Sequence, residues 1–574
     1  MSYLKSVGTA VIYIGLFLAF VTFIPGLPPN TEFREYSIVE PRDVDPKIGP
    51  KNRLNNVEKL FEGRFVGPEA FASYDGQLYT GIHDGYVLRI EEDTLVPIAK
   101  FGKKCDGLWQ EHKCGRPLGM RFDKKGNLYV VDSYYGIFKV NVESGEYKNI
   151  VNTSKPIDGK IPHIPNSIDV SENGDLYWTT SSTDFALYDG ALTFLADPTG
   201  RFIRYNAAKK KNEVLLKNLG FPNGVILSDD ESFVLVSESL ECRILKYHLK
   251  GPKAGQKEVF IDGLPGIPDN IQSDGQTGFL VTTVFTITPE HPLLSLSLTP
   301  HPNLRKMILR LALLMELPFK LLQDIYPNTF TEKVIHAIGS FQLGEIFNTY
   351  KKSFVLRIDA SGNIMELLSS DDDAFYGISE AYIHNGFVWF GSPWRNYIGR
   401  VSLKQAFPDL SNNEKQSSRT RESAAASNVK SEKAKRDTVS ASASTTSKPT
   451  PTPTTTPKPT TSTTSKPTAP KPSPTPKVDK PTTTDSSNAK PSKTKPISQS
   501  ANDAKVKKNA ETVSDAKPNT KSNSPNAKTE TDNKKEGAAK NVKVEQDASI
   551  KEKVQKSPPK KVKTIEANRP KDDL

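Results

Sequence analysis

Short apolar segments alternate with polar turns over roughly the first 400 residues, and six of the turns join segments spaced as β-hairpins. The hairpins cover residues 71–81, 119–132, 167–179, 225–236, 271–281 and 381–391. Most turn centres, such as Asp75-Gly76 and Asn173-Gly174, are pairs that tolerate the positive φ angles of a tight hairpin. The turns recur about every 44 to 57 residues, with one interval about twice as long. This period predicts an all-β fold, a six-bladed β-propeller.

The long interval between the fifth and sixth hairpins has a helical pattern over residues 304–317. The apolar positions that share one helix face are Leu304, Met307, Leu311, Leu314 and Met315. Pro318 is expected to end or kink this helix. We therefore predict a helical insertion before the last blade. A cap over the channel mouth, a membrane-contacting helix and simple packing on the blades remain open, because an apolar stripe suits all three.

The chain begins with an uncharged apolar run over residues 7–24, which follows Lys5 and is long enough to span a bilayer. The sequence after the run lacks a small-x-small cleavage site, which favours an uncleaved signal-anchor over a cleaved signal peptide. We predict a single-pass type II protein of the plasma membrane or an endomembrane. Residues 1–27 would hold the short cytoplasmic end and the anchor, and the rest would be extracellular or lumenal.

Composition divides the remaining chain into five parts. They are a spacer (28–55), the propeller (56–405), a linker (406–444), a Ser/Thr/Pro tract (445–477) and a Lys-rich tail (478–574). The tract is typical of an O-glycosylated mucin-like stalk, although an unmodified linker has the same composition. The tail is expected to be disordered. The net charge is +11, but the lysines are spread through the tail rather than clustered with aromatic residues, so no nucleic-acid binding is expected.

Three cysteines fit an oxidising compartment. Cys105 and Cys114 bracket a short polar segment and are predicted to form a disulfide, with two reduced thiols as the alternative. Cys242 is left over and is expected to be a buried thiol. Asn152, in an Asn-Thr-Ser sequon, is the predicted N-glycosylation site in a loop between blades.

Polar residues precede most of the hairpins, where the innermost strand of each blade would face a central channel. Four blades offer oxygen-bearing side chains in one register, namely Glu69, Asn166, Asn223, and Asp269 with Asn270. Such residues also cap turns, so each one alone has a structural explanation. Calcium prefers roughly six to eight oxygen ligands from carboxylates and amides, and the shared register therefore predicts a calcium site.

Longer motifs resemble a known family. The motifs are Cys114-Gly-Arg-Pro-Leu-Gly119, Phe221-Pro-Asn-Gly-Val225, Leu264-Pro-Gly-Ile-Pro-Asp-Asn-Ile271 and Ser379-Glu380 before His384-Asn-Gly386. Over about residues 30–405 the chain resembles the adipocyte plasma membrane-associated proteins of the strictosidine synthase-like family. The resemblance implies a membrane-anchored six-bladed propeller related to paraoxonases and gluconolactonases. Their catalytic calcium would be held here by Glu69, Asn166, Asn223, Asp269 and Asn270.

The chain departs from related enzymes at two places. Strictosidine synthases use a glutamate in the sixth blade, where this chain has Ser379, and Glu380 is one step away and would face the opposite side of the strand. Strictosidine synthase activity is therefore not expected. Paraoxonases pair two histidines near the metal, and no such pair is evident here. His83 and His163 are interpreted as surface or loop histidines.

Two functions remain open at this point. The first is a calcium-dependent arylesterase or lactonase, in which the cation polarises the carbonyl of a small ester or lactone while water attacks. The second is a non-catalytic surface receptor or adhesion glycoprotein whose O-glycans bind lectins or cell-surface ligands. A histidine or carboxylate base beside the metal would distinguish the two functions. The sequence shows no such base, and the catalytic residues stay unassigned.

Overall fold

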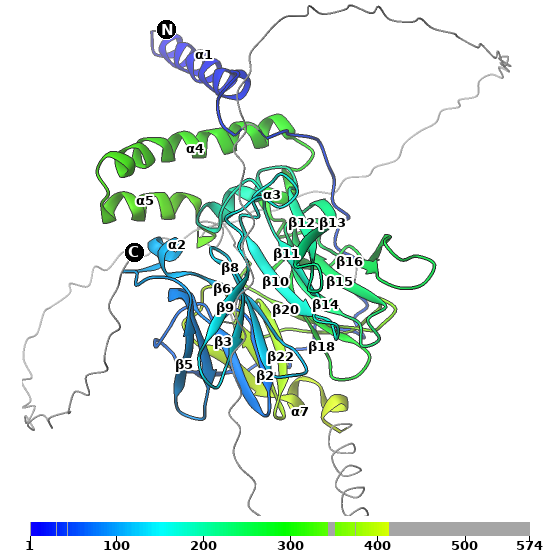
Figure 1. Cartoon of the computed structure of the whole chain (residues 1–574). Coiled ribbons are helices and arrows are strands. Elements are labelled where there is room, and N and C mark those ends of the chain that lie inside the picture. Colours follow the sequence, from blue (N-terminus) through cyan, green and yellow to red (C-terminus); the bar gives the residue numbers. More distant parts are fainter. Residues whose placement is uncertain (1, 30, 43, 343–349, 373–374, 413–574) are drawn as a thin grey trace, which may run out of the picture. The chain divides into compact units, whose positions relative to one another are not determined.

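The computed structural model describes residues 2–29, 31–42, 44–342, 350–372 and 375–412. Within these residues the strands form six antiparallel sheets of four strands each (Figure 1). The first three sheets contain β2 (Phe71–Tyr74), β3 (Gln77–Gly81), β4 (Tyr86–Ile90) and β5 (Leu95–Lys100); β6 (Pro117–Phe122), β7 (Asn127–Asp132), β8 (Gly136–Asn141) and β9 (Tyr147–Val151); and β10 (Pro165–Val170), β11 (Leu176–Thr180), β12 (Gly200–Asn206) and β13 (Lys211–Leu219). The other three contain β14 (Pro222–Leu227), β15 (Phe233–Glu238), β16 (Arg243–His248) and β17 (Lys257–Ile261); β18 (Gly266–Ser273), β19 (Phe279–Thr286), β20 (Phe354–Ile358) and β21 (Ile364–Leu368); and β22 (Glu380–His384), β23 (Phe387–Gly391), β24 (Ile398–Ser402) and β1 (Glu58–Leu60).

All six hairpins expected from the sequence are present, and each provides the first two strands of one sheet. The first strands of neighbouring sheets contact one another in the order β2, β6, β10, β14, β18 and β22, and β22 contacts β2 again. Strand β1 pairs with β24, so the earliest strand of the chain completes the last sheet. The sheets therefore form a closed ring, which is the arrangement of a β-propeller.

Apolar side chains fill the space between neighbouring sheets. Val87, Leu128 and Val130 are fully buried in one cluster that joins the first and second sheets. The alternation of side chains along each strand places these residues on the faces that meet the next sheet. Each buried valine or leucine contributes about 1.5–3 kcal/mol to folding.

The segment predicted as a spacer lies along the sheets. The amide of Arg42 donates a hydrogen bond to the Gly263 carbonyl, and the amide of Lys51 donates to Leu367. Leu54 is buried in the apolar cluster of the last two sheets. The segment before β1 is therefore held against the ring by both backbone bonds and apolar contacts.

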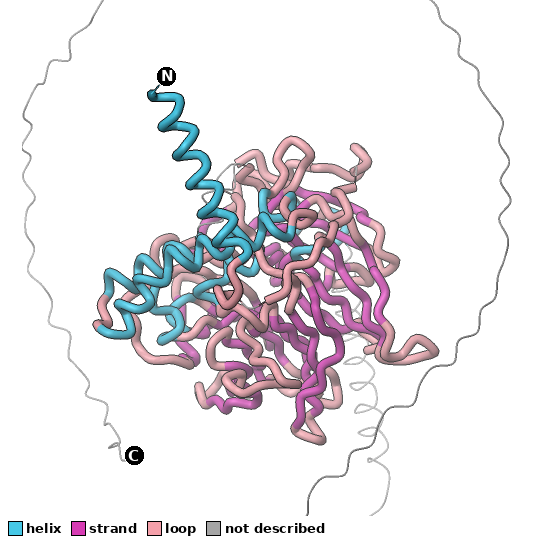
Figure 2. The backbone as a smooth tube through the Cα atoms, turned by 90° about the horizontal axis from the view of Figure 1, so that it is seen from above, coloured by secondary structure: helices cyan, strands magenta, loops and turns pink. Residues whose placement is uncertain are grey.

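Helices α3 (Leu294–Ser297), α4 (Pro302–Ile325) and α5 (Thr329–Gly339) lie between β19 and β20, the second and third strands of the fifth sheet. Figures 1 and 2 show α4 and α5 side by side, and the two helices are in contact. Of the two effects expected of Pro318, termination is wrong, because α4 continues to Ile325 with the proline inside it.

Further helices lie outside the insertion. The N-terminal helix α1 (Ser2–Phe23) includes the run Tyr3–Phe23, which is long and apolar enough to cross a membrane. The single turns α2 (Glu111–Cys114) and α7 (Leu403–Ala406) lie before β6 and after β24. The predicted linker is described only as far as residue 412, and the Ser/Thr/Pro tract and the Lys-rich tail lie outside the described residues.

The predicted disulfide between Cys105 and Cys114 is confirmed, with Cα atoms 5.5 Å apart. Cys242 is a buried thiol as expected, and burial raises its pKa to about 12. Asn152 is exposed directly after β9, in the connection between the second and third sheets.

We expect replacement of both Cys105 and Cys114 by serine to lower the free energy of unfolding by about 2–3 kcal/mol, because the bond closes a short loop in the unfolded chain. Denaturant unfolding followed by tryptophan fluorescence measures this difference. Reductant should destabilise the wild type to the level of the double variant and leave the variant unchanged. A double variant as stable as the wild type would contradict the expectation.

Candidate functional site

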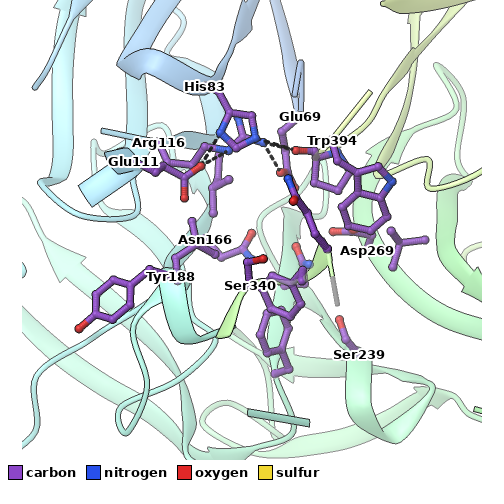
Figure 3. Close-up of a pocket in the computed structure, with 18 of the residues that line it drawn as sticks. Glu69, His83, Glu111, Arg116, Asn166, Tyr188, Ser239, Asp269, Ser340 and Trp394 are labelled. Carbon is purple, nitrogen blue, oxygen red and sulfur yellow. Dashed lines mark hydrogen bonds and ion pairs between the residues drawn. The ribbon is translucent and has the colours of Figure 1, made fainter. Parts of the chain in front are cut away.

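A pocket of about 120 Å³ lies where the innermost strands of five sheets begin (Figure 3). The polar residues lining it include Glu69, His83, Glu111, Arg116, Asn166, Asn223 and Asp269. The apolar residues include Leu118, Phe221, Ile267, Phe285, Phe341 and Trp394. The pocket thus combines a charged wall with a larger apolar surface, as expected for a small-molecule site.

Four innermost strands share a break in pairing near their first residues. The breaks follow Pro117 in β6, Pro165 in β10, Pro222 in β14 and Pro268 in β18. Such a bulge redirects side chains, and proline suits it because it has no amide hydrogen to pair. The residue after each proline, which is Leu118, Asn166, Asn223 or Asp269, lines the pocket. The common register seen in the sequence is therefore a repeated bulge that points one side chain per sheet toward the axis.

Glu69 and Asp269 are buried carboxyl groups that influence each other. Burial raises the pKa of Asp269 well above its usual value, and the charge of Glu69 raises it further. Burial also raises the pKa of Glu69, an effect that Arg116 partly offsets by donating from Nη2 to Glu69 Oε2 at 3.3 Å. A cation placed between the two carboxylates would favour the ionised form of both.

Several oxygen atoms in the pocket suit a hard cation. Asn223 Oδ1 and Asp269 Oδ1 are buried and have no hydrogen-bond partner among the described residues. The amide nitrogen of Asn166 donates to Ser181 Oγ at 3.1 Å, which leaves its oxygen as the atom that can face a ligand. Carboxylate and amide oxygens of this kind are the donors that calcium prefers, so the residues present fit the ion.

Asn270 differs from the other four predicted ligands. It is buried beside Asp269 in the bulge of β18, but it does not line the pocket. Its side-chain nitrogen has no hydrogen-bond partner among the residues described. Four of the five predicted ligands therefore meet in one pocket, and the fifth lies next to it.

His83 lies in the turn after β3, as the loop interpretation expects, but it is not a surface histidine, which corrects the other half of that expectation. It lines the pocket, with Nδ1 2.5 Å from Glu111 Oε1 and Nε2 3.0 Å from the Pro393 carbonyl oxygen (Figure 3). Arg116 Nε lies 3.4 Å from the same Glu111 oxygen. His83 and Glu111 are 28 positions apart in the sequence, and the turn after β3 and the disulfide loop bring them together. No local sequence pattern marks this contact. His163 remains outside the lining, in the loop before β10.

Glu111 is held ionised by its neighbours. Burial alone would raise the pKa of this carboxyl, but His83, Arg116 and the hydroxyl of Tyr134, which donates to Oε2 at 3.0 Å, together lower it. One signal of this group is visible in the sequence, because Arg116 stands inside the motif that begins at Cys114.

The helical insertion also contributes to the pocket. Helix α5 and the residues after it supply His336, Ser340 and Phe341 to the lining. Burial lowers the pKa of His336, with the charge of Glu111 opposing the shift. Its Nε2 is buried and has no hydrogen-bond partner in the described part of the chain. A second histidine therefore reaches the pocket from a segment far away in sequence.

Glu380 is buried between innermost strands and does not line the pocket. Gln272 of β18 donates to its Oε1 at 2.5 Å, and the backbone amide of Phe71 in β2 donates to its Oε2. Strand β22 begins only at Glu380, so strict alternation does not extend back to Ser379, whose hydroxyl bonds the Glu69 carbonyl oxygen at 2.8 Å. Burial raises the pKa of Glu380 to about 8.

Glu380 makes stability depend on pH. Its pKa in the folded protein lies above the ordinary value of 4.5, so the stabilisation is complete below about pH 4.5 and is lost as the pH rises toward 8. We expect the free energy of unfolding of the wild type to fall by a few kcal/mol relative to that of Glu380→Gln between pH 5 and pH 8. Thermal denaturation in EDTA at several pH values tests this, and parallel pH profiles for the two proteins would contradict it.

The comparisons with known proteins bear on the identity of the fold and family. The strictosidine synthase-like N-terminal profile matches residues 50–90, and the strictosidine synthase profile matches residues 166–252. Over 398 residues the chain is 37% identical to the adipocyte plasma membrane-associated protein Hemomucin of Drosophila melanogaster, which covers 68% of each chain. The chain belongs to the adipocyte plasma membrane-associated protein family. This family was the one indicated by the sequence motifs, and that prediction is confirmed.

Vertebrate members of the adipocyte plasma membrane-associated protein family are also similar. The protein of Danio rerio is 37% identical over 307 residues, 53% of this chain and 73% of its own. Among solved structures, a gluconolactonase from Xanthomonas campestris gives a TM-score of 0.38 at 13% identity, covering 66% of this chain and 99% of that one.

Proposed function

We propose that this protein is a membrane-anchored propeller whose central pocket binds calcium and hydrolyses small esters or lactones. One observation supports the proposal most directly. A histidine with an unpartnered nitrogen, His336, lines the same pocket as the oxygen donors Glu69, Asn166, Asn223 and Asp269. Bound calcium would polarise the carbonyl of the substrate and stabilise the charge that develops on its oxygen.

The two histidines of the pocket take different roles in this proposal. Both ring nitrogens of His83 already face acceptors, Glu111 and the Pro393 carbonyl. His336 has a lowered pKa, so its ring is neutral at pH 7 and Nε2 can accept a proton. We assign His336 as the general base that takes the proton of the attacking water, and the His83–Glu111 pair as the fixed charged group beside it.

The apolar wall indicates the class of substrate. Phe221, Phe285, Phe341 and Trp394 surround the pocket with aromatic rings. Aryl and alkyl groups bury their surface well against such rings. Aryl esters and apolar lactones therefore fit this pocket better than sugars or charged esters.

The remaining parts of the chain complete the proposal. We assign α1 as an uncleaved signal-anchor in a single-pass type II topology, with the propeller extracellular or lumenal. The relatives share the words plasma membrane-associated in their names, which agrees with an anchored protein. We propose that the six sheets act as six blades and that the tract over residues 445–477 is an O-glycosylated mucin-like stalk able to bind lectins or other cell-surface ligands.

Calcium titration of the purified full-length chain tests the proposed function. Calorimetry should show saturable calcium binding, and hydrolysis of phenyl acetate should stop in EDTA and return when calcium is added. A protein that binds no calcium down to millimolar affinity would end the hydrolase proposal. The non-catalytic surface receptor or adhesion glycoprotein would then be the surviving function.

We expect the protein to migrate on denaturing gels well above its chain mass, because O-glycans on the Thr/Pro tract add mass and hinder detergent binding. Deletion of residues 440–480 should remove most of the excess. The matched control is a deletion of equal length within residues 500–540, which should remove only its own peptide mass. Equal shifts for the two deletions would refute the mucin-like stalk.

A further inference from the structure

Helix α4 carries charged side chains among its buried residues. Arg305 and Glu316 lie on the side that packs against the rest of the protein, together with Leu309, whereas Arg310 is buried beneath the end of α1. Arg305 donates to Asp197 Oδ1 at 3.1 Å and to three backbone carbonyl oxygens, and Lys320 lies 2.8 Å from Glu316 Oε2. A surface helix of a water-soluble domain normally places its charges outward and its apolar side chains inward. The inner side of α4 combines ion pairs and hydrogen bonds with apolar contacts of Leu309, Ala312 and Leu313.

The outward side of α4 is apolar and continues into the turn before α5. We define the α4 face as the exposed large apolar residues Leu304, Met315, Leu317, Leu321, Leu322, Ile325, Tyr326 and Phe330. Met315 is 58% exposed and Ile325 is 83% exposed. Apart from α1, the rest of the described chain shows exposed large apolar residues only singly. A concentration of exposed apolar side chains on one helix and the turn after it marks a surface that meets another apolar surface.

Helix α1 is fixed directly to α4. The guanidinium of Arg310 donates to the carbonyl oxygens of Val21, Thr22 and Ile24 through Nη1 and to that of Leu27 through Nη2, at 2.8 to 3.0 Å. These carbonyls lie at and just beyond the C-terminal end of α1, where a helix has no internal partners for them. The end of the apolar helix that leads toward a membrane is therefore held against α4 (Figure 1).

We propose that the α4 face lies in the interface of the same bilayer that α1 enters. Arg310 holds the end of α1 against α4, so the α4 face is held close to the point where the chain leaves the membrane. An interfacial helix buries its apolar side at the boundary between headgroups and acyl chains, and the exposed apolar residues of the α4 face provide that side. The α4 face is thus a second, monotopic membrane contact. It rests on the anchor assigned to α1 above.

Fluorescent labels at introduced cysteines test this contact in the full-length chain reconstituted into phosphatidylcholine liposomes. Met315→Cys and Leu322→Cys place an environment-sensitive thiol label on the α4 face. The native cysteines do not interfere, because Cys105 and Cys114 are bonded and Cys242 is buried. The matched control is Ala208→Cys, an exposed position in the turn between β12 and β13, at the opposite ends of the strands from the pocket.

The two α4 labels are expected to be quenched by nitroxide-bearing lipids and shielded severalfold from aqueous iodide, whereas the Ala208→Cys label shows the reverse. Labels at Met315→Cys and Leu322→Cys that iodide reaches as readily as the control would overturn the proposal. Labels reached by neither quencher would mean that a second copy or another part of the chain covers the face, and they would overturn it as well. Alkaline extraction of the same liposomes tests the anchor separately, because a protein anchored by α1 stays in the membrane. A failed α4 contact is therefore distinguishable from a failed anchor.

Discussion

Replacing Asp269 with asparagine is expected to abolish both the stabilisation of this protein by calcium and its hydrolysis of phenyl acetate. Asp269 is one of the two carboxyl groups in the proposed ligand set, the other being Glu69, and both line the pocket together with Asn166 and Asn223. Removing its charge leaves Glu69 as the single carboxylate of the proposed ligand set, and the charge of Glu69 is already shared with Arg116. The remaining negative charge then attracts a divalent ion too weakly to offset the free-energy cost of dehydrating it.

The sign of the effect on stability depends on calcium. A ligand that binds only the folded state stabilises it by about 3 kcal/mol when present at a hundred times its dissociation constant. Without calcium, ionised Asp269 is unfavourable, because burial and the charge of Glu69 both raise its pKa. The Asp269→Asn variant is therefore expected to be at least as stable as the wild type in EDTA and clearly less stable in calcium.

Thermal denaturation of Asp269→Asn and of the wild type, each with and without calcium, measures these differences in stability. Asp175→Asn serves as the control, since Asp175 is a buried carboxylate at the far end of the third sheet, paired with Arg204 at 2.5 Å. That variant should lose stability in both conditions and keep the full increase on adding calcium. An Asp269→Asn protein that still gains stability from calcium would place the ion elsewhere.

The fold could be predicted from the sequence because its signal is local and repeated. Each hairpin needs only two alternating segments and a turn such as Asp75-Gly76, and six of them at a regular period suffice to indicate six sheets. Three of the four pocket-lining donors, Asn166, Asn223 and Asp269, were found for the same reason, because each follows a proline at a bulge in β10, β14 or β18. Glu69 also follows a proline, Pro68, just before β2.

The rest of the pocket could not be predicted, because it depends on contacts between distant segments. Glu111 reaches His83 only after the chain has folded the Cys105–Cys114 loop over the first sheet, and His336 arrives from an insertion more than 200 residues later. The contacts of Glu380 with Phe71 and Gln272 also join separate sheets, so alternation along one strand does not predict them. Periodicity predicts which face a strand residue occupies, but it predicts nothing about residues in the loops between strands.

Replacing His336 with glutamine is expected to lower kcat/KM for phenyl acetate by roughly 10²- to 10⁴-fold, the usual contribution of a general base. Glutamine keeps the approximate size of the side chain but cannot accept the proton of the attacking water. His163→Gln is the matched control, because His163 is also partly buried, burial also lowers its pKa, and it lies outside the pocket.

The pH profile and calcium binding separate a catalytic role of His336 from a structural one. Because burial holds the pKa of His336 below its ordinary value of 6.5, the wild-type rate should stay constant through neutral pH and fall only in more acidic buffer, as the ring becomes protonated. The His336→Gln variant should lose this acidic limb while keeping the calcium-dependent gain in thermal stability. A variant that keeps the acidic limb would assign the base to another group, and one that also loses the response to calcium would show that α5 supports the pocket structurally.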